Sequence, residues 1–171
     1  YRDLSDDALV EQVAEAVDSV FGAPVPPSEV RRDLQYGDLT LLAGDRCRVW
    51  WRDLEGVFPG EELYLTTVTE WAAISRGAFA PQAMVERWQG PDGPAELEFM
   101  LDGRQHRVHH PNVHDDHLNI GIVRDINRLI AGTGYRFAVC DNLGMPNWIT
   151  VLTSEERDQL RRDRGWSFLD L

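Results

Sequence analysis

A chain of 171 residues with 43% hydrophobic residues and a formal net charge of −12 is long enough to bury a core as one domain. Its surplus of carboxylates repels phosphate backbones and disfavours binding to nucleic acid, and it has no apolar run of the roughly 18 residues that a membrane span needs. Two cysteines without framework spacing, and the lack of a signal-peptide pattern, favour a cytoplasmic protein.

The N-terminal part of the chain is predicted to be helical on both sides of a linker. Apolar residues from Leu9 to Val20 recur at the spacing of one helix face, which predicts an amphipathic helix over residues 1–22. Three prolines within residues 23–27 predict a linker, and a second short helix is predicted over residues 28–36. We expect these helices to close the core of the domain.

Three strands are predicted in the segment that follows. They are short, rich in β-branched and aromatic residues, and bounded by turn residues. They cover residues 39–43, 47–51 and 62–68. In the last segment helix and strand compete, because Thr67 and Glu70 have the spacing of a capping box that would start a helix over residues 68–76.

Residues 83–110 are predicted to form a β-meander. Apolar and polar residues alternate over residues 95–101, and Asp102-Gly103 is typical of a two-residue type I′ hairpin turn. Such a turn places Leu101 opposite Arg104 and thereby fixes the register of the two strands. The facing pairs are then Phe99 with His106, Leu97 with Val108, Glu98 with Arg107 and Glu96 with His109. This register gives His106 and His109 structural roles, beside an aromatic ring and opposite a carboxylate.

The C-terminal part is predicted to be an αββα segment over residues 118–165. An amphipathic helix begins near Leu118, two strands follow, and the spacing of Thr153 and Glu156 predicts a capping box for the last helix. The predicted fold class is therefore α+β, in one domain over residues 1–171. We expect a single antiparallel, meander-rich sheet with helices packed on one face and the N-terminal helices closing the core.

The charge is distributed unevenly along the chain. Residues 1–100 hold 19 acidic side chains against eight arginines, whereas the rest holds ten against nine. Such an acidic half would attract a basic protein. Adjacent tryptophans in a strand point to opposite faces, so one of them is available as an anchor. The predicted partner-binding residues are Trp50, Trp51, Glu61 and Glu62.

All five histidines lie between His106 and His117, and this clustering has two interpretations. In the first, Asp115 or Asp116 is the N-cap of the helix near Leu118, and no cofactor is required. In the second, zinc or another transition metal is bound in a tetrahedral site. The residues of that metal site would be His110, His114, Asp116 and His117.

The sequence lacks a nucleophile elbow, a phosphate-binding glycine loop, a dinucleotide fingerprint and paired zinc cysteines. Four short segments carry a resemblance instead, and they are Trp71-Ala-Ala-Ile-Ser-Arg76, Asp115-Asp-His-Leu-Asn119, Ile126-Asn-Arg-Leu-Ile130 and Leu152-Thr-Ser-Glu-Glu156. With them the chain resembles small cytoplasmic α+β proteins of bacterial toxin-immunity and uncharacterised families. The resemblance implies a stoichiometric binder that occludes a basic toxin without a cofactor.

The sequence therefore predicts a non-catalytic, acidic protein-binding domain, such as an immunity or inhibitor protein. The alternative is a metal-dependent, hydrolase-like enzyme built on the histidine cluster. A second alternative is an accessory domain of a larger protein, because the chain begins without a methionine. The identity of the partner, the oligomeric state and the roles of Cys47 and Cys140 remain open.

Overall fold

The computed structural model describes residues 5–21, 26–28, 38–39, 48–52, 60–90, 93–110, 118–141 and 147–171. Its elements in chain order are α1 (Asp6–Phe21), β1 (Val49–Arg52), α4 (Leu63–Ile74), β2 (Gln82–Trp88), β3 (Ala95–Leu101), β4 (Arg104–His110), α5 (Ile122–Leu129), η1 (Ala131–Thr133), β5 (Tyr135–Val139), β6 (Asn147–Thr153) and α6 (Ser154–Arg164). The mixture of helices and antiparallel strands confirms the predicted α+β class.

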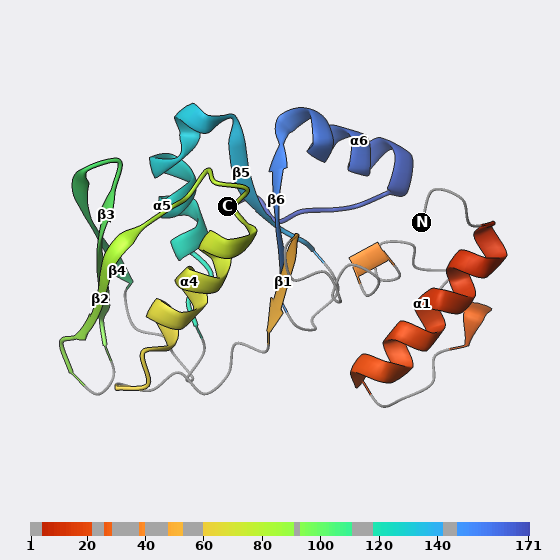
Figure 1. Cartoon of the computed structure of the whole chain (residues 1–171), viewed down its shortest axis with the longest axis horizontal. Coiled ribbons are helices and arrows are strands. Elements are labelled where there is room, and N and C mark those ends of the chain that lie inside the picture. Colours follow the sequence, from red (N-terminus) through yellow and green to blue (C-terminus); the bar gives the residue numbers. More distant parts are fainter. Residues whose placement is uncertain are drawn as a thin grey trace.

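The strands form two sheets, so the prediction of a single sheet is imprecise. Sheet A has the order β1-β6-β5, and sheet B has the order β2-β3-β4. Figure 1 shows sheet B at one end of the molecule, sheet A near the middle, and α4 and α5 between them. The two helices contact both sheets, and one hydrophobic cluster is shared by all of these elements. The two sheets are therefore joined by packing against α4 and α5, and not by pairing of their strands.

Sheet A is buried on both faces, and apolar residues follow one another along β6 accordingly. On β6, Ile149 and Val151 belong to the cluster shared with sheet B, whereas Trp148 and Leu152 belong to a second cluster. Successive strand residues point to opposite faces, so each strand contributes to both clusters. The second cluster is covered by the C-terminal segment with Trp166 and Phe168 and by Leu160 of α6. Helices therefore cover both faces of sheet A, not one face as the sequence predicts.

Sheet B has the register that its hairpin turn predicts. Phe99 pairs with His106 and Glu98 with Arg107, and both turn residues, Asp102 and Gly103, have positive φ angles of 51° and 73°. Those angles are the ones that a type I′ turn requires. The predicted third strand is β2, which pairs antiparallel with β3 and carries an irregularity between Gln82 and Val85. The predicted β-meander is therefore confirmed.

The segment predicted as a strand over residues 62–68 is a helix, because its buried residues repeat at helical spacing. In α4 the buried side chains are Tyr64, Thr67, Val68, Trp71 and Ile74. A helix places residues three and four apart on one face, which here packs into the core. The β-branched residues that favoured a strand are outweighed by this tertiary burial.

The helix predicted near Leu118 begins later, and neither Asp115 nor Asp116 is its N-cap. The N-cap of α5 is Gly121, with no side-chain cap. Asn119 builds the preceding turn, because its Oδ1 accepts from the amide of Gly121 at 2.9 Å and its own amide donates to the hydroxyl of Tyr64 at 3.0 Å. These two hydrogen bonds, one of which is to Tyr64 of α4, therefore favour a turn before the helix begins at residue 122.

The αββα order of the C-terminal part is confirmed, including the start of its last helix. The Thr153 hydroxyl accepts from the amide of Glu156 at 3.1 Å, and Glu156 accepts from the amide of Thr153 at 2.8 Å. These two bonds form the predicted capping box, and Gly165 ends the helix with a φ of 69°.

The predicted N-terminal helix is confirmed as α1, which Figure 1 shows at the end of the molecule opposite sheet B. Among the described side chains, none from α1 belongs to either hydrophobic cluster. The expectation that it closes the core is thus not confirmed. Most of the predicted linker, of the helix over 28–36 and of the strand over 39–43 lies outside the described residues. The described exceptions are Pro26, Pro27, Ser28 and Leu39. No described helix is long and apolar enough to cross a membrane.

Candidate functional site

The two histidines of β4 whose side chains are described have the structural partners that the hairpin register predicts. The ring of His106 stacks on Phe99, with ring centroids 5.9 Å apart. The Nδ1 atom of His109 lies 3.2 Å from a carboxylate oxygen of Glu96, which is 11% exposed. Both histidines are thus accounted for by contacts within sheet B.

The predicted metal site is not tested by the described residues. His110 ends β4, but its side chain is not described, and His114, Asp116 and His117 lie outside the described residues. Within the described ranges, no three or more His, Cys, Asp or Glu side chains are grouped in a way that could hold a metal ion. Metal binding by this segment therefore remains a hypothesis from the sequence.

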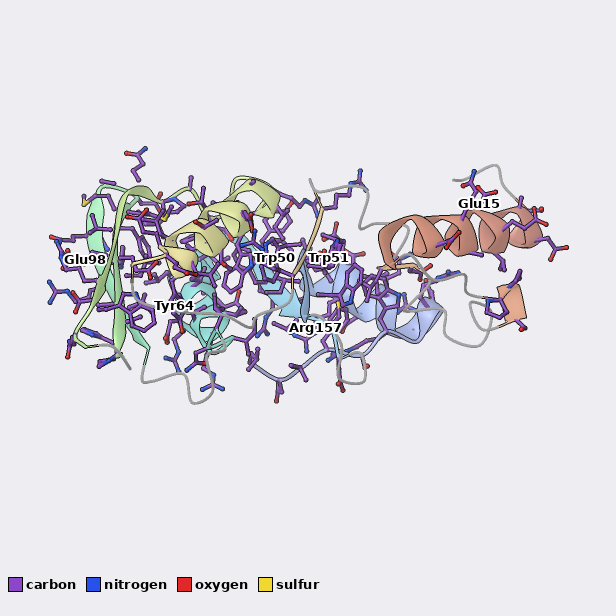
Figure 2. The ribbon with its side chains drawn as sticks, turned by 90° about the horizontal axis from the view of Figure 1, so that it is seen from below. Glu15, Trp50, Trp51, Tyr64, Glu98 and Arg157 are labelled. Atoms are coloured by element: carbon purple, nitrogen blue, oxygen red, sulfur yellow. The ribbon has the colours of Figure 1, made fainter. Side chains whose placement is uncertain are left out.

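The two adjacent tryptophans of β1 point to opposite faces of sheet A, as predicted. Trp50 is 6% exposed, packs edge-on against Trp71 and donates from Nε1 to a carboxylate oxygen of Glu70 at 2.7 Å. Trp51 is half-buried and stacks on Trp148 with ring centroids 5.6 Å apart. Trp50 is a core residue, and its burial argues against the predicted role in partner binding, whereas Trp51 is only half-buried. Figure 2 labels both side chains.

Glu61 and Glu62 lie at the surface directly before α4. Both are exposed, and Glu62 is the N-cap residue with a φ of 51°, although its side chain makes no capping bond. The structure does not bring them together with Trp51, because α4 packs into the cluster on the opposite face of sheet A. The four residues predicted from sequence therefore do not form one surface.

A denser group of carboxylates lies on α1. Asp7, Glu11, Glu15 and Asp18 are all exposed, and their spacing of four, four and three residues places them on one face of the helix. The sixteen residues of α1 include no lysine or arginine. We call this group the acidic stripe. The signal for this stripe is the helical spacing of the carboxylates in the sequence, which the net charge of a whole half of the chain does not reveal.

A pocket with a volume of about 910 Å³ lies between sheet A and α6. Two ion pairs border it, namely Arg76 with Glu156 at 2.7 Å and Arg164 with Asp38 at 2.5 Å. No histidine or cysteine is among its described lining residues. This pocket therefore does not bring a nucleophile next to a histidine base in the part of the chain that the structure describes.

Cys140 is buried as the sequence predicts, and its environment suppresses its reactivity. Burial raises the pKa of its thiol to about 12. Because the thiolate is the nucleophilic form, this cysteine is unreactive near neutral pH. Cys47, the other cysteine, lies outside the described residues.

Glu86 performs a capping role that the sequence did not indicate. Its carboxylate accepts from the amide of Leu65 in the first turn of α4 at 2.8 Å and from Nε1 of Trp88 at 2.7 Å. The cap comes from β2, more than twenty residues after the amide that it satisfies. No local pattern predicts such a contact, because it depends on how β2 and α4 pack.

We found no family model, no curated protein and no solved structure that matches this chain. The resemblance to toxin-immunity proteins therefore remains an expectation from the sequence motifs, and function has to be inferred from the surface of this molecule.

Proposed function

We propose that this protein is a non-catalytic binding domain whose acidic surface recognises a basic protein partner. The observation that supports this proposal best is the acidic stripe of α1, because it concentrates carboxylates on one exposed helix face with no basic residue in the helix. Figure 2 shows Glu15 of this stripe at the end of the molecule away from Glu98 of sheet B. The stripe is thus placed where a large partner can approach it.

The spacing of the stripe carries an energetic cost that binding would offset. Like charges four residues apart destabilise an isolated helix by about 0.2–0.5 kcal/mol per pair. Glu11 and Glu15 are such a pair, and Asp18 follows Glu15 by three residues. Arginine or lysine side chains of a partner would replace this repulsion with charge-assisted hydrogen bonds. The net charge of −12 would also steer a basic partner toward the protein.

Occlusion of a basic partner is the activity that follows from this surface. A domain that covers the cationic substrate-binding surface of a toxin inhibits it stoichiometrically and needs no turnover. The resemblance of the sequence to immunity-type proteins agrees with this mode of action. Glu61 and Glu62 add exposed carboxylates to the same half of the chain.

The test compares two variants of equal net charge. The first, Glu11→Gln with Glu15→Gln and Asp18→Asn, removes three carboxylates from the stripe. The matched control, Asp102→Asn with Asp141→Asn and Glu155→Gln, removes three exposed carboxylates elsewhere. The probe is a synthetic nona-arginine peptide, and its affinity for the full chain is measured by calorimetry at several salt concentrations.

We expect the stripe variant to bind the peptide about tenfold more weakly, which corresponds to the loss of about 1.4 kcal/mol. The control should lose less than twofold, and only the stripe variant should show a shallower salt dependence. Equal losses in both variants would mean that the peptide responds to net charge alone, and the proposal of a binding surface on α1 would be rejected.

A further inference from the structure

Although the protein is acidic, three arginines line one pocket that is built from the C-terminal part of the chain. The pocket lies where α5, η1, the start of β5 and the start of α6 meet, and its volume is about 460 Å³. Arg124, Arg128 and Arg136 line it, and none of its other described lining residues is an Asp or Glu. Three arginines thus contribute to the wall of one pocket.

Packing between α5 and β5 holds together the backbone segments that carry these arginines. The side-chain amide of Asn127 donates to the carbonyl of Phe137 at 2.9 Å, and its Oδ1 accepts from the amide of the same residue at 2.7 Å. This pair of bonds ties the helix to the strand next to Arg136. Arg124 and Arg128 are four residues apart and therefore lie on the same face of α5. We call the three side chains the arginine triad.

Two of the three arginines have described partners of their own. Arg128 pairs with Asp125 at 3.0 Å on an exposed part of α5, and Arg136 donates to the backbone oxygen of Leu171 at 2.8 Å. Asp125 is the one acidic side chain that pairs with the triad among the described ion pairs. Arg124 and Arg136 therefore have no Asp or Glu partner among the described ion pairs.

Further positive charge lies beside the triad on α6. Arg157 and Arg161 both lie over the ring of Phe168, at 5.7 Å and 5.6 Å from its centroid. Burial lowers the pKa of Arg157, and the charges of Arg161 and Arg136 lower it further, whereas Asp170 and Asp158 act in the opposite direction. Figure 2 shows Arg157 near the middle of the molecule, away from Glu15 of the acidic stripe.

We propose that the arginine triad binds a small ligand that carries a phosphate group. A guanidinium donates two parallel hydrogen bonds to an oxyanion, and three of them around one pocket match the several oxygens of a phosphate. A phosphate can accept hydrogen bonds from several guanidinium groups at once, whereas a single carboxylate has only two oxygens to offer. The net charge of −12 repels a nucleic acid, so the ligand is a small molecule and not a polymer.

The test uses inorganic phosphate as the probe and the full chain as the protein. Binding is measured by NMR chemical-shift titration at constant ionic strength, with acetate as the monoanion for comparison. Arg124→Gln with Arg128→Gln removes two members of the triad. The matched control is Arg104→Gln with Arg162→Gln, which removes two exposed arginines outside the pocket.

We expect saturable binding of phosphate that weakens at least tenfold in the triad variant and less than twofold in the control. Acetate should bind at least tenfold more weakly than phosphate. Non-saturable binding, equal effects of the two variants, or equal affinity for acetate would each overturn the proposal. Neutralising the acidic stripe should leave phosphate binding unweakened, so this proposal and that of a basic protein partner can fail separately.

Discussion

Sheets A and B contain three antiparallel strands each, but they differ in what covers their second face. Sheet A buries both faces, and Trp148 is completely inaccessible on the face that looks away from sheet B. Sheet B buries one face and covers the other with charged side chains. On that face Glu98 receives hydrogen bonds from Arg87 and Arg107, and Glu96 lies close to His109.

This difference shows where stability is concentrated. Burying a large aromatic side chain contributes several kcal/mol, whereas exposed ion pairs contribute about 1 kcal/mol or less. Substitutions in sheet A should therefore destabilise the protein more than substitutions on the outer face of sheet B. Four predictions test this ranking, beginning with the largest effect.

The first prediction concerns the second cluster of sheet A. Replacing Trp148 with alanine should lower the free energy of unfolding by about 3–5 kcal/mol, because it removes a buried ring that stacks on Trp51. Urea denaturation measures the change. Gln105→Ala, on the exposed outer face of sheet B, is the control and should change stability by less than about 0.5 kcal/mol. Similar losses in both variants would contradict the ranking.

The second prediction concerns the cap that sheet B supplies to α4. Glu86→Ala should cost about 1–3 kcal/mol, because it leaves the amide of Leu65 and the indole of Trp88 without their acceptor. Hydrogen exchange of the Leu65 amide should accelerate. Val85→Ala, at an exposed neighbouring position of the same strand, is the control and should have a much smaller effect. An unchanged Leu65 exchange rate would argue against the cap.

The third prediction concerns the pH dependence of the charged face of sheet B. Hydrogen bonds from Arg87 and Arg107 lower the pKa of Glu98 below 4.5. A carboxyl whose pKa is lower in the folded state stabilises the fold above its unfolded pKa, and this contribution is lost as the pH falls through the folded pKa. Replacing both arginines with glutamine should raise the pKa of Glu98, as measured by NMR of its carboxyl carbon.

Arg104→Gln provides the control for that titration, because Arg104 lies in the hairpin without a bond to Glu98 among the described contacts. It should leave the pKa of Glu98 nearly unchanged. A pKa that does not move in the double variant would show that the two arginines do not stabilise the carboxylate.

The smallest expected effect concerns the histidines beyond sheet B. His114→Ala with His117→Ala should change stability by less than about 0.5 kcal/mol, because we expect no bound metal there. Elemental analysis of protein purified without a tag or metal-affinity resin tests this expectation. Stoichiometric zinc that the double variant loses would instead favour the metal-dependent enzyme.

The sequence determined those features that depend on neighbouring residues. Asp102-Gly103 fixed the register of a whole hairpin, and the spacing of Thr153 and Glu156 fixed the start of α6. These features are local because a turn or a cap closes over two to four residues and its geometry leaves few alternatives.

Only the tertiary structure decided which distant segments meet. It divided the strands into two sheets, turned residues 63–74 into a helix, delayed the start of α5 to residue 122, and brought Glu86 to the end of α4. It also gathered the arginine triad from a helix and a strand. The helical spacing of α4 is present in the sequence, but there it competes with β-branched residues that favour a strand. The other outcomes depend on contacts between segments far apart in the chain, which the local spacing of residues does not specify.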